Sequence, residues 1–108
     1  MDASLARMLF TPRSVAIIGA SDDPSKTTSR PLKYLCKAGF SGAIYPVNPR
    51  SRTVLGRQAF ASIEDVPEVP DHAFILLPAD MAIETIAQCG RHGVKVATIL
   101  ASGFSESG

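Results

Sequence analysis

The sequence predicts an α/β fold built on a doubly wound parallel sheet. Short runs of apolar, largely β-branched residues recur along the chain, and segments with apolar residues at helical spacing separate them. The first run ends on Gly19, a residue that lets the chain turn sharply after a strand. Strands that alternate with helices in this way favour a Rossmann-like arrangement, with parallel strands joined by right-handed crossovers.

Four strands are predicted, at residues 14–18, 43–47, 73–77 and 94–100. Their continuous apolar character is typical of parallel strands that are buried on both faces of a sheet. Pro46 lies inside the second run and has no backbone N–H to donate. We therefore expect it at a strand end or at a position whose N–H would be unpaired.

Two main helices are predicted between the strands. The first begins at the N-cap residue Ser29 and ends at Gly39, and the second spans residues 79–89, with Gly90 and Gly93 as stop signals. A shorter helix is expected from Ser62, and the first ten residues are expected to form a small helix against the sheet edge.

The composition is that of a single globular domain over residues 1–108. The chain is 45% apolar and 19% charged, and its net charge of +1 offers no field to attract nucleic acid or a membrane surface. Without a signal peptide or a membrane span, a cytoplasmic location is expected. Cys36 and Cys89 are predicted to be buried free thiols. The loop-like residues 101–108 suggest an N-terminal fragment of a longer, multidomain protein.

Ligands of such sheets bind beyond the carboxyl ends of the strands, where the strand order reverses. The turn at Gly19 and the N-terminus of the next helix would form an anion site there, and Lys26 could meet a phosphate group. Alternatively, Gly19 is needed only for the turn, and Lys26 is a solvated surface charge. The long polar stretch that leads to Ser29 favours the ligand-binding interpretation.

The loops after the first and second strands narrow the choice of ligand. The segment from Gly19 lacks the second and third glycines of the G-x-G-x-x-G fingerprint, and no acidic residue follows the second strand to bind the ribose of NAD. Arg50 and Arg52 stand there instead and could hold a phosphate on the ribose, unless they are simply solvated. NADP and coenzyme A (CoA) both remain open from this reasoning.

Five segments carry a resemblance to a known family: residues 12–26, 39–50, 77–79, 89–95 and 101–106. Together they resemble the N-terminal CoA-binding domain of NDP-forming (ADP-forming) acyl-CoA synthetases, or acetate–CoA ligases, and more distantly the α subunit of succinyl-CoA synthetase. The resemblance implies that the nucleotide end of CoA is held by Gly19, Ala20, Ser21, Asp22 and Lys26. It further implies that the adenosine and its 3′-phosphate lie near Asn48, Pro49 and Arg50. The path to the thiol would be lined by Pro78, Ala79, Ser102 and Gly103. Thr27 and Thr28 depart from the small, glycine-rich step of many members, which leaves the exact shape of the phosphate loop open.

The family joins a carboxylic acid to CoA with a nucleoside triphosphate, through an acyl phosphate and a phosphohistidine. The resemblance implies that ATP or ADP binds in downstream ligase domains, or in a partner subunit. His72 and His92 match neither the histidine nor the nucleotide site of the family, and we expect surface or internally satisfied histidines. No catalytic residue and no metal ligand is therefore predicted in this segment.

Two other functions stay open at this stage. The same domain occurs, by resemblance, as a stand-alone or regulatory CoA-binding module, and an NADP-binding oxidoreductase domain is the third possibility. The continuation of the reading frame would distinguish the synthetase from the stand-alone or regulatory module. Binding of NADP in place of CoA would identify the oxidoreductase domain.

Overall fold

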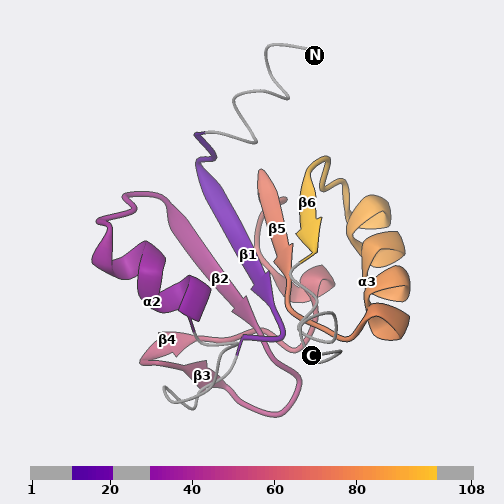
Figure 1. The fold of residues 1–108 in the computed structure, drawn as a ribbon, viewed down its shortest axis with the longest axis horizontal. Helices are drawn as coiled ribbons and strands as arrows, with labels where there is room; N and C mark the ends of the chain where they lie inside the picture. Colours follow the sequence, from indigo (N-terminus) through magenta and orange to yellow (C-terminus); the bar gives the residue numbers. More distant parts are fainter. Residues whose placement is uncertain (1–10, 21–29, 100–108) are drawn as a thin grey trace, which may run out of the picture.

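Four parallel strands form the central sheet of the structure, a computed structural model that describes residues 11–20 and 30–99 (Figure 1). They are β1 (Ser14–Ile18), β2 (Ala43–Val47), β5 (His72–Ile75) and β6 (Ala97–Ile99), in the order β2-β1-β5-β6. Two α-helices, α2 (Arg30–Lys37) and α3 (Ala79–His92), accompany them. A two-stranded hairpin, β3 (Thr53–Val54) and β4 (Arg57–Gln58), and one 3-10 turn, η2 (Ile63–Asp65), lie between β2 and β5.

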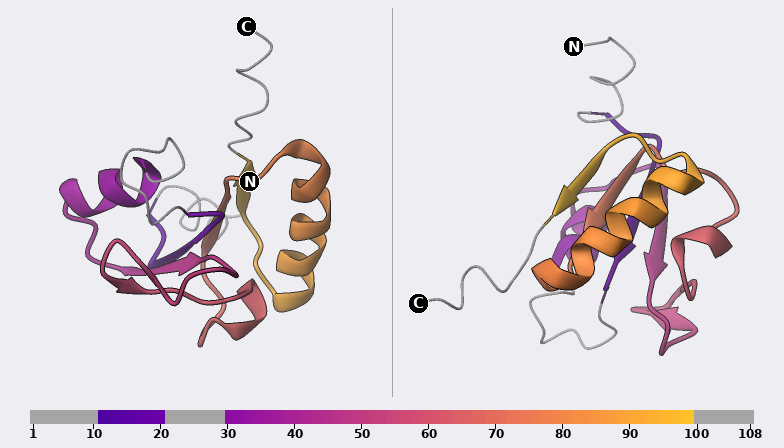
Figure 2. Two further views of the ribbon diagram at one scale, coloured as in Figure 1. Left: turned by 90° about the horizontal axis from the view of Figure 1, so that it is seen from below. Right: turned by 90° about the vertical axis from the view of Figure 1, so that its right-hand side faces the viewer.

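The strand order confirms the predicted doubly wound sheet. From β1 the chain moves outward through α2 to β2, and from β5 it moves outward through α3 to β6 on the other side. Crossovers of one hand that run in opposite directions place their helices on opposite faces of the sheet. Figure 2 shows α2 and α3 on the two sides. The direction of winding therefore reverses between the neighbouring strands β1 and β5.

The side chains of β1 alternate between two separate cores. Val15 and Ile17 pack with Leu32 of α2 on one face. Ala16 and Ile18 pack on the other face with the α3 residues Ala82 and Cys89. Every residue of β1 is buried, as expected for a central strand covered on both faces.

Pro46 lies within β2 without disturbing the ladder with β1. β2 is at the edge of the four-stranded sheet, and the Pro46 carbonyl accepts a hydrogen bond of 2.9 Å from the backbone N–H of Phe60. Because the N and O of one strand residue point the same way, the missing N–H of Pro46 would also face this outer edge. The expectation that Pro46 occupies an unpaired position is therefore confirmed.

Several predicted elements differ in length from those observed. β5 begins at His72, and β6 occupies only Ala97–Ile99 of the predicted run 94–100, whose last residue lies outside the described part. The helix predicted from Ser62 is a single 3-10 turn, in which the Ser62 hydroxyl contacts the Asp65 carboxylate at 3.4 Å and caps no helix N–H. The helix predicted in the first ten residues lies outside the described part of the chain.

Helix α3 continues past the predicted stop at Gly90 to His92, and Gly93 is its C-cap residue. Gly93 adopts a left-handed conformation with φ of 102°, and its N–H bonds to the carbonyls of Cys89 and Gly90. Cys89 is buried and forms no disulfide, and burial raises the pKa of its thiol. This agrees with the predicted buried free thiol. The side chain of Cys36 lies outside the described part.

We expect Ile17→Ala to lower the free energy of unfolding by roughly 3–4 kcal/mol, because it leaves a cavity in the core under α2. Ile83→Ala on α3 is the matched control, since Ile83 is 72% exposed and its replacement should change stability by less than about 0.5 kcal/mol. Urea unfolding of both variants measures the difference. Equal losses would contradict the assignment of Ile17 to the core.

Candidate ligand-binding site at the carboxyl ends of the strands

The carboxyl ends of β1, β2 and β5 meet at Gly19, at the lower end of the sheet in Figure 1. The Gly19 N–H donates to the Val47 carbonyl at 2.9 Å, which ties the end of β1 to the end of β2. The Leu76 N–H donates to the Ile18 carbonyl at 2.8 Å and ties β5 to β1 in the same way. The loops that follow these three strands therefore start from one fixed point.

Gly19 is required at this point for two reasons. Its φ is 91°, a conformation that residues with a Cβ rarely adopt. A Cβ built on Gly19 would lie 2.6 Å from the carbonyl oxygen of Leu76. The sequence predicted the sharp turn, whereas the close approach of the β5 backbone is visible only in the fold.

The side chain of Asn48 joins the loop after β1 to the loop after β2. Its Nδ2 donates to the Ala20 carbonyl at 3.0 Å, and its Oδ1 accepts from the Arg50 backbone N–H at 2.8 Å. The backbone N–H of Asn48 donates in turn to the Phe60 carbonyl at 2.8 Å. The structure thus brings together three predicted site residues, Ala20, Asn48 and Arg50.

A cleft of about 230 Å³ opens beside these loops, on the α3 face of the sheet. Gly19, Val47 and Pro49 form one wall of it. Ser62 and Ile63 form a second wall. The third wall is formed by Leu77, two residues before α3, and by Met81, Thr85 and Gln88 of α3. The Thr85 hydroxyl is engaged within the helix, where it donates to the Met81 carbonyl at 3.1 Å.

The helical wall was missed in the sequence, where Met81 was assigned to the apolar face of a helix. The signal was present, because Met81, Thr85 and Gln88 recur at helical spacing soon after Pro78 and therefore share one side of α3. Their side faces the cleft only because α3 packs beside η2. That contact depends on tertiary structure.

The hairpin β3–β4 was also missed, since residues 48–57 read as a loop. Its turn is formed by Leu55, with φ of 50°, and Gly56, with φ of 83°. The returning strand leads to Phe60, which pairs with the outer edge of β2, and so to Ile63 in the cleft wall. The hairpin itself packs in the core on the α2 face through Val54, and the segment after it supplies the cleft wall on the other face.

Tyr45 and Glu68 hold the segment behind this wall. The Tyr45 hydroxyl donates to a carboxylate oxygen of Glu68, and its ring packs edge-on against Phe60 at 5.8 Å. The hydrogen bond to Glu68, together with partial burial and the carboxylate charge, raises the pKa of Tyr45 to about 12. Tyr45 is therefore a neutral donor at ordinary pH and has a structural role.

The other predicted site residues divide into two groups. Pro78 and Ala79 mark the start of α3 at this edge, and Pro49, Arg50 and Arg52 follow β2, where both arginines are exposed. Five predicted residues lie outside the described part of the chain: Ser21, Asp22, Lys26, Ser102 and Gly103. Of the twelve residues expected to hold CoA, the structure describes seven, all at one edge of the sheet: Gly19, Ala20, Asn48, Pro49, Arg50, Pro78 and Ala79.

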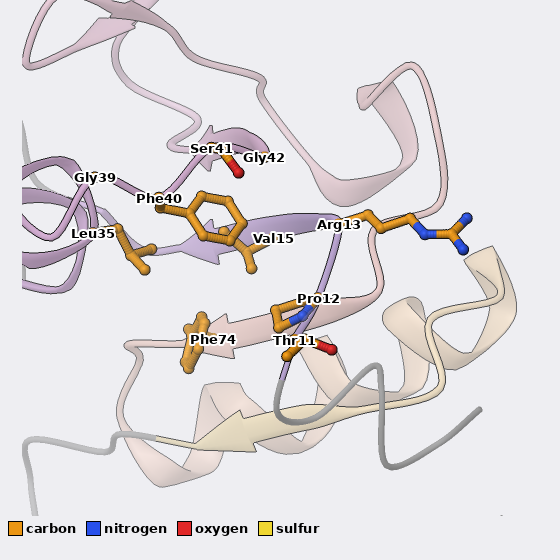
Figure 3. A pocket seen from close by; sticks show the side chains of 10 residues that line it. All are labelled: Thr11, Pro12, Arg13, Val15, Leu35, Gly39, Phe40, Ser41, Gly42 and Phe74. Carbon is orange, nitrogen blue, oxygen red and sulfur yellow. The ribbon is translucent and has the colours of Figure 1, made fainter. Parts of the chain in front are cut away.

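A larger cavity of about 730 Å³ lies at the opposite, amino end of β1 (Figure 3). Leu35, Phe40 and Phe74 give it an apolar lining, and the side chain of Arg13 extends away from it. Nearby at the start of β5, His72 is buried, stacks on Phe74 at 4.4 Å and contacts the Thr98 hydroxyl at 2.7 Å. His72 is therefore a buried histidine that is bonded inside the fold through its Nε2 atom.

Comparison with known proteins identifies the family. A family model described as the CoA binding domain matches residues 13–107. The chain belongs to the CoA-binding domain family. This confirms the resemblance found in the sequence.

Within the described residues no cluster of His, Cys, Asp and Glu could hold a metal ion, and no described helix is long and apolar enough to cross a membrane.

Several of the similar proteins are named as acetate–CoA ligases or acetyl-coenzyme A synthetases. The chain is 44% identical over 102 residues to acetate–CoA ligase [ADP-forming] II of Archaeoglobus fulgidus, covering 94% of this chain and 15% of that protein. It is 40% identical over 99 residues to the α subunit of acetate–CoA ligase [ADP-forming] II of Pyrococcus furiosus, covering 92% of this chain and 21% of the subunit. The solved apo structure of acetyl-coenzyme A synthetase 1 from Ca. Korarchaeum cryptofilum superposes with a TM-score of 0.85 at 41% identity, covering 94% of this chain and 22% of that one. The chain thus spans about a fifth or less of the length of these relatives.

We expect Gly19→Ala to lower the free energy of unfolding by roughly 3 kcal/mol or more, from backbone strain plus the clash with Leu76. Gly39→Ala is the control, because Gly39 has a φ of 78° and nothing lies within 4 Å of the position that a Cβ would take there. It should cost only the strain, about 1–2 kcal/mol. Denaturant unfolding compares the two, and equal costs would show that the approach of Leu76 is unimportant.

Proposed function

We propose that this chain binds CoA at the carboxyl ends of β1, β2 and β5, as the CoA-binding part of an NDP-forming acyl-CoA synthetase. The observation that carries the proposal is the junction at Asn48, which holds the loops after β1 and β2 together in a chain of the CoA-binding domain family. Open α/β sheets bind their ligands at this edge, where the winding reverses.

The cleft suits one end of the CoA molecule. Its volume of about 230 Å³ is below the roughly 300–1,000 Å³ of pockets that enclose a whole drug-sized ligand. Apolar side chains of Ile63, Leu77 and Met81 offer a surface for the adenine ring. Arg50 follows Pro49 of the cleft wall and is the proposed partner of the 3′-phosphate, through charge-assisted hydrogen bonds.

The remainder of CoA is proposed to cross the edge of the sheet from this cleft. Gly19 and Ala20, with Ser21, Asp22 and Lys26, would hold the pyrophosphate. Pro78 and Ala79, with Ser102 and Gly103, would line the path to the thiol. Small residues and free backbone N–H groups suit such close approach of a ligand to the chain.

The proposed reaction joins a carboxylic acid, CoA and ATP to give acyl-CoA, ADP and phosphate. The names of the relatives as ADP-forming acid–CoA ligases support this direction, and those of Pyrococcus furiosus occur as α subunits. Among the described residues that line the cleft there is no histidine, cysteine or carboxylate. We propose that residues 1–108 are the CoA-binding unit of a longer protein, which positions CoA while downstream ligase domains or a partner subunit bind ATP or ADP and carry the chemistry.

Titration of the chain with CoA, dephospho-CoA, NADP and ATP tests the proposal, with the melting temperature as the measurement. A ligand that binds only the folded state raises this temperature. We expect CoA to give the largest rise and NADP none at equal concentration. A rise with NADP in the absence of one with CoA would replace the proposal by the oxidoreductase alternative.

Arg50→Ala should weaken CoA binding by roughly 1.5–3 kcal/mol, because a charge-assisted contact to the 3′-phosphate is lost. Dephospho-CoA, which lacks this phosphate, should bind to the variant as it does to the unmodified chain. Arg91→Ala, at the other end of α3, is the matched control and should leave both affinities unchanged. Calorimetry measures the affinities of both variants and of the unmodified chain for CoA and dephospho-CoA. Equal losses for the two ligands in Arg50→Ala would show that Arg50 does not bind the 3′-phosphate.

A further inference from the structure

We propose that Asn48 is a positioning residue that sets the place of Arg50 relative to the phosphate loop, and so the preference for CoA over dephospho-CoA. This inference rests on the proposed function, and it changes the role of Asn48 from a direct contact with the adenosine to an internal link. Its starting point is that one side-chain amide bonds to two loops that follow different strands.

The partners of the amide determine its orientation. The Ala20 carbonyl can only accept, so it requires the NH₂ group at 3.0 Å. The Arg50 N–H can only donate, so it requires the amide oxygen at 2.8 Å. Asparagine supplies a donor and an acceptor at the correct separation on a short side chain, and neither aspartate nor serine can reproduce both bonds.

The position of Asn48 itself is fixed by its neighbours in the fold. Its backbone N–H donates to the Phe60 carbonyl at 2.8 Å, and the carbonyl of the preceding residue, Val47, accepts from Gly19 at 2.9 Å. Ala20 is fully buried, so its carbonyl is attached to a part of the chain that has little room to move. The amide therefore connects two anchored segments to one exposed turn.

The link to Asn48 fixes the backbone position of Arg50 before a ligand binds. It is exposed, and a long exposed side chain loses rotamer freedom when it binds a ligand. The bond from Asn48 Oδ1 to the Arg50 N–H spans two residues and forms an Asx turn, in which Pro49 fixes one backbone angle. Such preorganisation lowers the cost of binding without adding a contact to the ligand.

Two substitutions separate the two halves of the link. Asn48→Ser keeps a hydroxyl acceptor for the Arg50 N–H but cannot reach Ala20, whereas Asn48→Ala loses both bonds. We expect Asn48→Ser to weaken CoA and dephospho-CoA alike, by roughly three- to tenfold, and to keep the ratio of their dissociation constants. We expect Asn48→Ala to lower the preference for CoA, measured as the dissociation constant of dephospho-CoA divided by that of CoA, by a factor of about three or more.

The same pair in an Arg50→Ala background distinguishes positioning from direct contact. If Asn48 acts on selectivity through Arg50, Asn48→Ser and Asn48→Ala should bind CoA equally once the guanidinium is absent. A difference that persists in this background would overturn the proposal, as would an unchanged ratio in Asn48→Ala. A loss of stability alone would lower the melting temperature without changing the ratio. If Asn48→Ala does not fold, Asn48→Ser still tests the proposal, because a changed ratio in Asn48→Ser would overturn it.

The wild-type titration separates this inference from the proposed function. Failure of the unmodified chain to bind CoA would overturn both. Binding of CoA that is stronger than that of dephospho-CoA, with a ratio insensitive to Asn48, would overturn the positioning role and leave the proposed function in place.

Discussion

The approach of the Gly19 backbone to the carbonyl of Leu76 is the contact on which the carboxyl edge of the sheet depends. With hydrogen at the position of a side chain, β1 can end directly against β5 while its last N–H still reaches Val47 of β2. A Cβ would force the ends of β1 and β5 apart. The loops after these strands would then start from different places, and the bond from Asn48 to Ala20 would be stretched or lost.

The reversal of winding explains why the loops gather at this edge. The chain leaves β1 toward α2 on one face and leaves β5 toward α3 on the other, so the two following segments diverge from neighbouring strands. The space between the diverging segments is filled from the β2 side by η2 and from the opposite side by α3. The place of the cleft therefore follows from the topology, whereas the side chains that line it are determined by the sequence.

Features that act locally could be predicted from the sequence, whereas their arrangement in the site could not. The strand at residues 14–18 and the turn at Gly19 needed no knowledge of the rest of the chain. The hairpin was missed because the pairing of β3 with β4 imposes a positive φ on Leu55, whose side chain signals no such conformation. Asn48 was placed near Gly19 because neighbouring parallel strands end together, but its bonds to both loops depend on the exact register between β1 and β2. Met81 lines the cleft because α3 packs beside η2, and this contact between distant segments could not be predicted from the sequence.

Pro46 also determines where the sheet can grow. Phe60 occupies the outer side of β2, and the proline removes a hydrogen-bond donor from the same edge. An incoming strand would meet an edge that is already paired in part and lacks one donor, which protects it from unintended association. Within the described residues, the far edge at β6 is paired on the β5 side alone. Extension of the sheet by another strand is therefore directed to β6, away from the hairpin and the β2 edge.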